Sequence, residues 1–389
     1  MEHHLLGAIC VVFVGALVAA TVALSARQAM IVGYLLIGAI CGPHGVGLID
    51  DPKLIEELSH VGIIFLLYLL GLSLQPKQLL TMLGEAFAVT LWSSVAVLGA
   101  VMAVLLAFGF TTAEAFIVGA AMMFSSTIIG LKLLPTTTLH HQHAGQVVVS
   151  VLLLQDMIAI ALLVGLETYA ASETTALSAL ATKFIALPLL LGLCVLIERY
   201  VLERLIARFD RIQEYVFLLV IAWCLGVATV ASLVGLSPET GAFIAGVALA
   251  SSPISPFISE TLRPLRDFFL IMFFFALGAD FDLSSAPQVA APAVLTAVLV
   301  LALKPVIFRI FLRRSGETPK LSSEIGVRLG QASEFALLIG FLALNLELIS
   351  STASDLIQLA TLITFVVSSY VVVLRYPTPI GVSERLRQD

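Results

Sequence analysis

Long apolar segments alternate with short polar loops along the whole chain. A window of about 20 apolar residues is long enough to cross the hydrocarbon core of a bilayer, and thirteen such windows occur here. The predicted spans are residues 5–24, 29–48, 55–74, 85–109, 113–134, 146–168, 179–202, 214–234, 238–252, 262–283, 289–313, 322–346 and 353–375. The pattern therefore predicts an all-α polytopic membrane protein with 13 transmembrane helices, embedded in membrane lipid.

Composition supports this fold class and narrows the function. The chain is 60% hydrophobic and 12% charged, and no soluble domain of useful size fits between the spans. We expect residues 1–380 to form one membrane transport domain and residues 381–389 to begin a cytoplasmic tail or linker. No nucleophile, base and orienting group cluster in a recognisable motif, so we expect no enzyme activity, and we expect no nucleic-acid partner.

Basic residues predict the orientation of the spans. Cytoplasmic loops are enriched in Lys and Arg. Seventeen of the 20 basic residues, Arg328 among them, are assigned to odd-numbered loops or the final tail, and only Lys53 and Lys183 to even-numbered loops. This asymmetry predicts an N-terminus outside and a C-terminus in the cytoplasm.

An internal repeat relates the two halves of the chain. Three pairs of segments match at an offset of 207 or 208 residues: Gly33–Gly38 with Gly241–Gly246, Tyr68–Gly71 with Phe275–Gly278, and Ser126 with Ser333. Each span then corresponds to the span seven places later, so the halves enter the membrane in opposite senses. The sequence therefore predicts two inverted six-helix repeats, as in secondary transporters whose substrates bind near the midplane, with 179–202 as a linker helix.

Asp156 is the strongest candidate for the chemistry of this protein. It lies about ten residues, roughly 15 Å, from either end of span six and cannot reach water. Carboxylates inside membrane spans are costly and usually mark an ion or substrate path. Because burial disfavours the charged form, Asp156 could hold either a proton or a potassium or sodium ion. One carboxylate exchanging one proton for one monovalent cation predicts electroneutral exchange. We expect the adjacent Gln155 to bond a neighbouring helix rather than share the ion.

Polar residues interrupt span five and its repeat mate, span twelve. Span five contains Ser125, Ser126 and Thr127, and span twelve contains Gln331 and Ser333. Matching interruptions in two inverted repeats indicate discontinuous helices that cross at a binding site. We expect these residues to compensate for the chain breaks and to face the ion beside Asp156.

Two further charges lie inside the spans, and each has more than one interpretation. Glu334 could be a fixed partner of a basic group or helix end, or could take part in transport directly. Lys304, about 13 Å inside span eleven, could extend to the surface, pair with Asp156 or Glu334, or balance the ends of half-helices. His140, His141 and His143 fall in a predicted cytoplasmic loop, where a solvated loop is expected and a pH sensor is conceivable.

Seven motifs resemble those of a known transporter family. In order they are Gly33–Pro43 (GYLLIGAICGP), Gly62–Leu74 (GIIFLLYLLGLSL), Ser125–Thr127, Leu154–Asp156, Gly235–Gly246 (GLSPETGAFIAG), Leu265–Gly278 (LRDFFLIMFFFALG) and Gly330–Phe335. Together they resemble the Kef-type branch of the monovalent cation:proton antiporters over nearly the whole chain.

The resemblance carries several expectations. It implies the sodium/proton antiporter fold, a homodimer and elevator-type transport. The moving core would comprise the spans within 85–168 and 289–375, and the dimer scaffold the spans within 5–74 and 214–283. The pair Gln155-Asp156 is similar to that of potassium-selective members. Sodium:proton exchange on the same fold and a gated potassium channel are the alternatives.

The chain departs from the family pattern in three places. Kef-type proteins usually continue into a cytoplasmic nucleotide-binding domain, whereas this sequence ends at Asp389. We expect no cofactor in the chain itself, and a nucleotide only through such a regulatory domain or subunit. In the loop after span nine, where glutathione-gated members carry acidic residues, this chain reads Ser251–Glu260 (SSPISPFISE), which argues against that form of regulation. Ser333 stands where the family usually has Gly.

Overall fold

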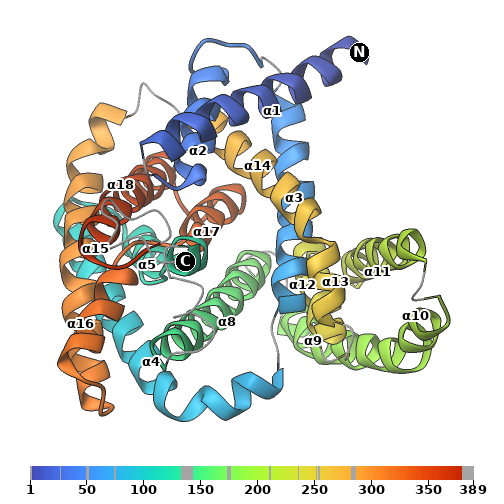
Figure 1. The fold of residues 1–389 in the computed structure, drawn as a ribbon. Coiled ribbons are helices and arrows are strands. Elements are labelled where there is room, and N and C mark those ends of the chain that lie inside the picture. The colour runs from blue at the N-terminus through green and yellow to red at the C-terminus, as the bar shows by residue number, and fades with distance from the viewer. Residues whose placement is uncertain are drawn as a thin grey trace. The chain divides into compact units, whose positions relative to one another are not determined.

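The computed structural model describes residues 2–26, 28–49, 52–73, 76–132, 143–172, 177–209, 212–234, 236–250, 252, 255–281 and 286–378. These residues form helices joined by short turns (Figure 1). The first half comprises α1 (Glu2–Ser25), α2 (Met30–Cys41), α3 (Pro52–Ser73), α4 (Pro76–Ala107), α5 (Thr112–Met122), α6 (Thr127–Lys132) and α8 (His143–Ser172). A linker follows, made of α9 (Leu177–Ile197), the π-helix η1 (Glu198–Leu202) and α10 (Glu203–Phe209).

The second half comprises α11 (Gln213–Leu233), α12 (Pro238–Ala250), α13 (Ser255–Thr261), α14 (Arg263–Asp280), α15 (Ala286–Arg314), α16 (Pro319–Arg328), α17 (Glu334–Asn345) and α18 (Ser351–Arg375). The all-helical fold class is confirmed. Among the described residues, six helical segments are long and apolar enough to cross a bilayer: Leu6–Ser25, Phe87–Ala107, Ala144–Glu167, Gln213–Leu233, Pro287–Arg314 and Ser351–Arg375. Shorter apolar helices accompany them, and the number 13 stays a prediction.

Both predicted interruptions are present, in matching register. The chain leaves helical conformation between α5 and α6 and again between α16 and α17. Helix α5 is capped by Thr111 and α16 by Thr318, and these two caps are 207 residues apart. The first residues after the interruptions, Thr127 of α6 and Glu334 of α17, are also 207 residues apart. The repeat thus specifies equivalent helix starts as well as similar sequence.

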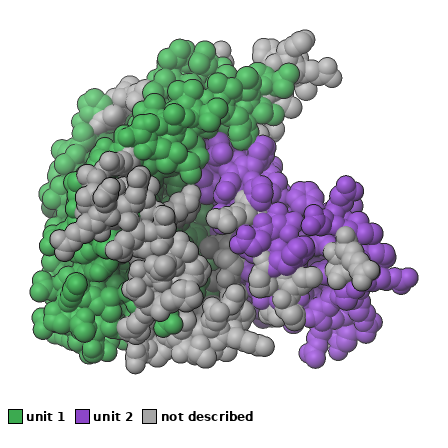
Figure 2. Space-filling view, in the orientation of Figure 1, with its two compact units in different colours: residues 1–50, 81–163, 277–389 green, residues 51–80, 164–276 purple. Residues whose placement is uncertain are grey.

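The chain divides into two compact units (Figure 2). Unit 1 contains residues 1–50, 81–163 and 277–389, and unit 2 contains residues 51–80 and 164–276. This division differs from the predicted core and scaffold, because spans one and two belong to the same unit as the crossing helices. The functional division into core and scaffold stays a prediction.

Glycines let helices of the two repeats pack with their backbones in contact. In unit 2, Gly71 of α3 lies against the backbone of α12 at Phe243. Its repeat mate in unit 1, Gly278 of α14, lies against the backbone of α2 at Leu35. Because a Cβ atom at either glycine would overlap these backbone atoms, only Gly permits the approach. Helices α2 and α12 are also repeat mates. At Gly71, α3 of the first repeat therefore contacts α12 of the second, and at Gly278, α14 of the second repeat contacts α2 of the first.

Candidate ion-binding site

Two chain interruptions in unit 1 meet at the candidate site. The Ser125 hydroxyl donates a hydrogen bond to the backbone carbonyl of Leu329, with a distance of 2.8 Å between the oxygens. The Gln331 side chain reaches back toward the Ser126 carbonyl, with an N–O distance of 3.5 Å. Ser125, Ser126 and Gln331 are fully buried. The predicted crossing of two discontinuous helices is therefore formed by direct contact between the interruptions.

Two repeat-related serines restart the helices after the interruptions. Ser126 Oγ accepts a hydrogen bond from the Ile129 amide at 3.1 Å, and Ser333 Oγ accepts one from the Phe335 amide at 3.1 Å. A helix start leaves backbone N–H groups without helical partners, and a serine side chain satisfies one of them. These two hydroxyls therefore act as N-caps, and each oxygen accepts a hydrogen bond from a backbone amide of its own helix.

Asp156 lies at the centre of α8, next to the first interruption. It follows Ala144, the first residue of its apolar segment, by twelve residues and precedes Glu167, the last, by eleven. Its residue exposure is 2%. The Thr127 hydroxyl lies 3.3 Å from both carboxylate oxygens. A carboxylate and a hydroxyl thus meet at mid-span, as the sequence predicts.

Gln155 bonds the first interruption. Its side-chain oxygen accepts a hydrogen bond from the Ser125 amide at 2.9 Å, and its side-chain nitrogen lies 3.5 Å from the Met123 carbonyl. Both contacts satisfy backbone groups that the broken helix leaves without helical partners. The Gln155 side chain therefore holds the interruption in place through contacts with backbone groups of Ser125 and Met123.

Lys304 of α15 joins the two interruptions. Its exposure is 0%. The ammonium donates to the carbonyls of Phe124 and Gln331, the latter at 2.8 Å, and lies 3.4 Å from Ser125 Oγ. Extension to the surface, one of the three predicted possibilities, is therefore wrong. The contacts of the ammonium are with the carbonyl-bearing ends of the interrupted helices, where a cation is electrostatically favourable, and no ion pair with Asp156 is formed.

Glu334 is the second acid of the site. It is half-buried in the first turn of α17, downstream of the Ser333 cap. Negative charge is favourable at a helix N-terminus. Two acids, Asp156 and Glu334, therefore lie on helices that border the interruptions, whereas the sequence argument for electroneutral exchange considered only Asp156.

Comparison with known proteins identifies the family. A family model described as "Sodium/hydrogen exchanger, transmembrane" matches residues 11–374. The chain belongs to this family.

Two named relatives are similar to this chain over most of its length. It is 30% identical over 313 residues to the glutathione-regulated potassium-efflux system protein KefC of Salmonella typhi, covering 79% of this chain and 50% of KefC. It is 25% identical over 347 residues to the iron transporter MagA of Paramagnetospirillum magneticum, covering 88% of this chain and 79% of MagA. The exchanger thus spans about half the length of KefC.

A solved structure confirms the fold. The sodium proton antiporter MjNhaP1 from Methanocaldococcus jannaschii matches the exchanger with a TM-score of 0.67 and 16% sequence identity. The match covers 94% of this chain and 96% of that chain. The sodium/proton antiporter fold is therefore confirmed. The superfamily expected from the seven motifs is confirmed by the family model and by the similarity to KefC.

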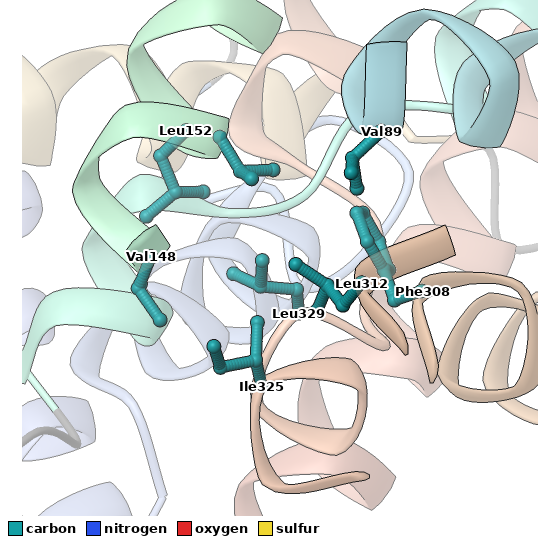
Figure 3. Close-up of a cluster of buried hydrophobic side chains, with 8 residues drawn as sticks. Val89, Val148, Leu152, Phe308, Leu312, Ile325 and Leu329 are labelled. Atoms are coloured by element: carbon teal, nitrogen blue, oxygen red, sulfur yellow. The ribbon is translucent and has the colours of Figure 1, made fainter. Parts of the chain in front are cut away.

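An apolar cluster packs beside the crossing of the exchanger (Figure 3). It contains buried side chains from four helices and from the second interruption: Val89, Val148, Val151, Leu152, Phe308, Leu312, Ile325 and Leu329. Leu152 is one helical turn before Asp156, and Leu329 supplies the carbonyl that Ser125 binds. The cluster therefore couples the helix of Asp156 to the half-helix α16 by close packing.

Two residues of α18 complete the site, and the sequence analysis missed them. Thr364 Oγ1 accepts a hydrogen bond from the Ala332 amide at 3.0 Å, and Ser368 Oγ donates to the Gln331 side-chain oxygen at 3.0 Å. Both satisfy groups of the second interruption. Their spacing of four residues on one face of an apolar span is a signal that could have identified them.

Among the predicted site residues, Asp156 and Thr127 place a carboxylate and a hydroxyl next to each other. The side chains of Gln155, Ser125, Ser126 and Ser333 hydrogen-bond backbone groups of the interruptions, and cation binding by any of the six stays a prediction. Carboxylate and hydroxyl oxygens are hard donors that suit alkali cations and protons. Among the predicted cytoplasmic histidines, His140 and His141 lie outside the described residues, and the side chain of His143 does too.

Proposed function

We propose that this protein exchanges potassium for protons across the bacterial inner membrane. The observation that carries the proposal is the Asp156 carboxylate, buried at mid-span beside Thr127 where two interrupted helices cross. A carboxylate in such a place is neutral when it holds a proton and neutral when it holds a monovalent cation. Competition between the two for one site is sufficient to couple their movements in opposite directions.

The proposed stoichiometry is one potassium ion for one proton. It requires that Glu334 keep the same charge state throughout the transport cycle, because a proton bound or released by this second acid would enter the charge count. Each loaded form of Asp156 then carries the same net charge, and exchange is independent of the membrane potential. A proton taken up or released by Glu334 in each cycle would make the exchange electrogenic.

Potassium is proposed over sodium because of Gln155 and the KefC relationship. The pair Gln155-Asp156 resembles that of potassium-selective members, and KefC is named as a potassium-efflux protein. MjNhaP1 is named as a sodium proton antiporter and MagA as an iron transporter, so sodium and iron belong in any test. Since Gln155 bonds the backbone of the interruption, it would act on selectivity by setting the position of that backbone.

The proposed assembly follows the fold family. The protein would be a homodimer with its N-terminus outside and its C-terminus in the cytoplasm, and a moving core would carry the ion by an elevator motion. Close packing around Leu152 and Leu329 supports a core that moves as one piece. A nucleotide-binding domain or subunit on the cytoplasmic side is the proposed regulatory partner.

Vesicle reconstitution tests the function. Purified protein in proteoliposomes with an internal pH dye should release protons on imposed potassium gradients, less strongly on sodium, and at the same rate with and without a membrane potential. Asp156→Asn should abolish the signal. Asp267→Asn should not, because Asp267 has a side-chain exposure of 57% and pairs with the neighbouring Arg266. Retained coupled flux in Asp156→Asn would contradict the mechanism.

The same experiment separates the alternatives. A sodium:proton antiporter would respond more strongly to sodium than to potassium. A gated potassium channel would carry rubidium or potassium tracer without any proton movement, and at rates beyond those of a carrier. Including ferrous iron among the gradients tests the activity suggested by the name of MagA.

A further inference from the structure

A buried arginine lies at the end of half-helix α16. Arg328 has an exposure of 3% and is the last helical residue before the second interruption. It therefore lies in a helix and not in the loop to which the sequence analysis assigned it, and the side of the membrane stays a prediction. A buried guanidinium requires partners that offset the cost of removing it from water. The contacts of Arg328 therefore identify the chain segments that it binds.

The first partner lies one turn earlier on the same helix. Arg328 Nε and Nη2 both donate to one carboxylate oxygen of Glu324, at 3.0 and 2.9 Å. This pair neutralises the buried charge. It also fixes the orientation of the guanidinium plane relative to α16.

The second partner is the chain segment that follows α18. Arg328 Nη2 donates to the Pro377 carbonyl at 2.9 Å, and the guanidinium carbon lies 5.4 Å from the centre of the Tyr376 ring. Thr378 is fully buried. We name residues 376–378 the strap. Arg328 therefore binds a backbone carbonyl and an aromatic ring of the strap across the end of α16.

The position of Arg328 connects the strap to the ion site. The next residue, Leu329, provides the carbonyl that Ser125 binds at 2.8 Å. Helix α16 also packs through Ile325 into the apolar cluster. The end of α16 is thus held both by apolar packing and by the strap.

We propose that Arg328 is a positioning residue for transport, which uses the strap to hold the end of α16 and thereby the crossing beside Asp156. Release of the strap would let the Leu329 carbonyl and the second interruption move. The geometry presented to the cation would then be less well ordered, and apparent cation affinity would fall. The kinetic part of this inference rests on the proposed function.

Two variants remove the contact from opposite sides. Arg328→Gln removes the guanidinium, and a triple variant, Tyr376→Gly with Pro377→Gly and Thr378→Gly, removes the ring and loosens the strap backbone. Arg375→Gln is the matched control, because Arg375 is exposed and lies 6.0 Å from the centre of the same Tyr376 ring. Arg328→Lys keeps the charge and should restore part of the effect.

The first measurement is hydrogen–deuterium exchange of the purified protein. We expect faster amide exchange in residues 329–333 and in the strap for Arg328→Gln and for the triple variant, and no change for Arg375→Gln. Unchanged protection of residues 329–333 in Arg328→Gln would overturn the proposal. This measurement requires no transport, so it decides the structural part even if the wild-type protein shows no exchange of cations for protons.

The second measurement is the kinetics of cation-driven proton flux. We expect Arg328→Gln and the triple variant each to raise the half-saturating potassium concentration roughly fivefold, the lower end of typical coupling between linked sites. Combining them should give no further increase, because both act through one contact. Additive effects, or a normal half-saturation in Arg328→Gln, would overturn the positioning role while leaving the proposed exchange intact. Wild-type protein without any coupled flux would overturn the proposed function instead.

Discussion

At the residue scale, most polar side chains of the site serve the backbone. Lys304 donates to carbonyls of both interruptions, and Gln155 accepts from the Ser125 amide. An unsatisfied backbone group in a membrane interior costs several kcal/mol, so every broken turn requires such partners. Asp156 and Thr127, whose side chains lie 3.3 Å apart, are the residues that we propose bind the transported ion.

Replacing Lys304 should destabilise the protein. Lys304→Met leaves the Phe124 and Gln331 carbonyls without their donor, and buried groups that lose a partner cost about 1–3 kcal/mol each. We expect a loss of about 2–5 kcal/mol, measured as a lower thermal unfolding temperature in detergent. Lys320→Met, at an exposed position of α16, should leave the temperature nearly unchanged. Equal stability of both variants would show that the ammonium does not hold the interruptions.

Shortening Gln155 should alter cation selectivity. Gln155→Asn lacks one methylene group, so the amide can no longer reach the Ser125 amide at 2.9 Å, and the interruption beside Asp156 should shift. We expect the ratio of half-saturating potassium to sodium concentrations to change about threefold or more, equivalent to roughly 0.6 kcal/mol. Gln146→Asn, exposed on the same helix, provides the control. An unchanged ratio would remove Gln155 from the explanation of selectivity.

At the scale of elements, glycine decides which helices can meet. Gly71 and Gly278 are repeat mates, and each lets its helix contact the backbone of a helix from the other repeat. Small residues at such places permit close helix approach in membranes, where packing rather than burial from water drives association. The reciprocal contacts explain why the motifs around these glycines match between the halves.

A pair of alanine substitutions tests this packing. Alanine favours a helix over glycine by about 0.5–1 kcal/mol, so Gly99→Ala should be neutral or stabilising, because no atom lies within 4 Å of its added Cβ. Gly278→Ala should lower the unfolding temperature instead, since its Cβ would overlap the Leu35 backbone. Measurement of both variants in the same detergent gives the comparison. A Gly278→Ala protein as stable as Gly99→Ala would contradict close packing of α14 on α2.

At the scale of the whole molecule, the two interrupted helices make the halves equivalent in fold and different in chemistry. The 207-residue register relates Ser126 to Ser333 and the starts of α6 and α17, yet it relates Asp156 to Ile363. Likewise, Lys304 corresponds to Val97. The repeat therefore accounts for the crossing of the two helices. Positions that differ between the repeats supply Asp156 and Lys304.

The charge state of Glu334 is testable through the membrane potential. If Glu334 keeps one charge state during the cycle, Glu334→Gln should change the rate or apparent affinity but leave exchange independent of an imposed potential. The measurement is proton flux in proteoliposomes driven by a potassium or sodium gradient, with and without a diffusion potential set by a gradient of a permeant anion such as thiocyanate. Potential-dependent flux in the wild type that disappears in Glu334→Gln would show that two acids carry charge in each cycle.

The sequence by itself determined the fold class, the repeat and the identity of the central acid. The sequence shows directly how long the apolar segments are, that Ser126 is in register with Ser333, and that span six contains a carboxylate. Broken helices and charged side chains are costly in a membrane interior, so these features restrict the possible structures. The interruptions could be predicted for the same reason, because polar clusters at equivalent places in two repeats require a common explanation.

Only the tertiary structure decided which partner each polar group takes. Lys304 had three plausible roles in the sequence, and contacts with two interruptions selected one of them. Thr364, Ser368 and Arg328 acquired their roles from chain segments 32 to 49 residues away. Hydrogen bonding is short-ranged and directional, so a one-dimensional pattern shows that a group needs a partner, and the packing of helices determines which one it finds.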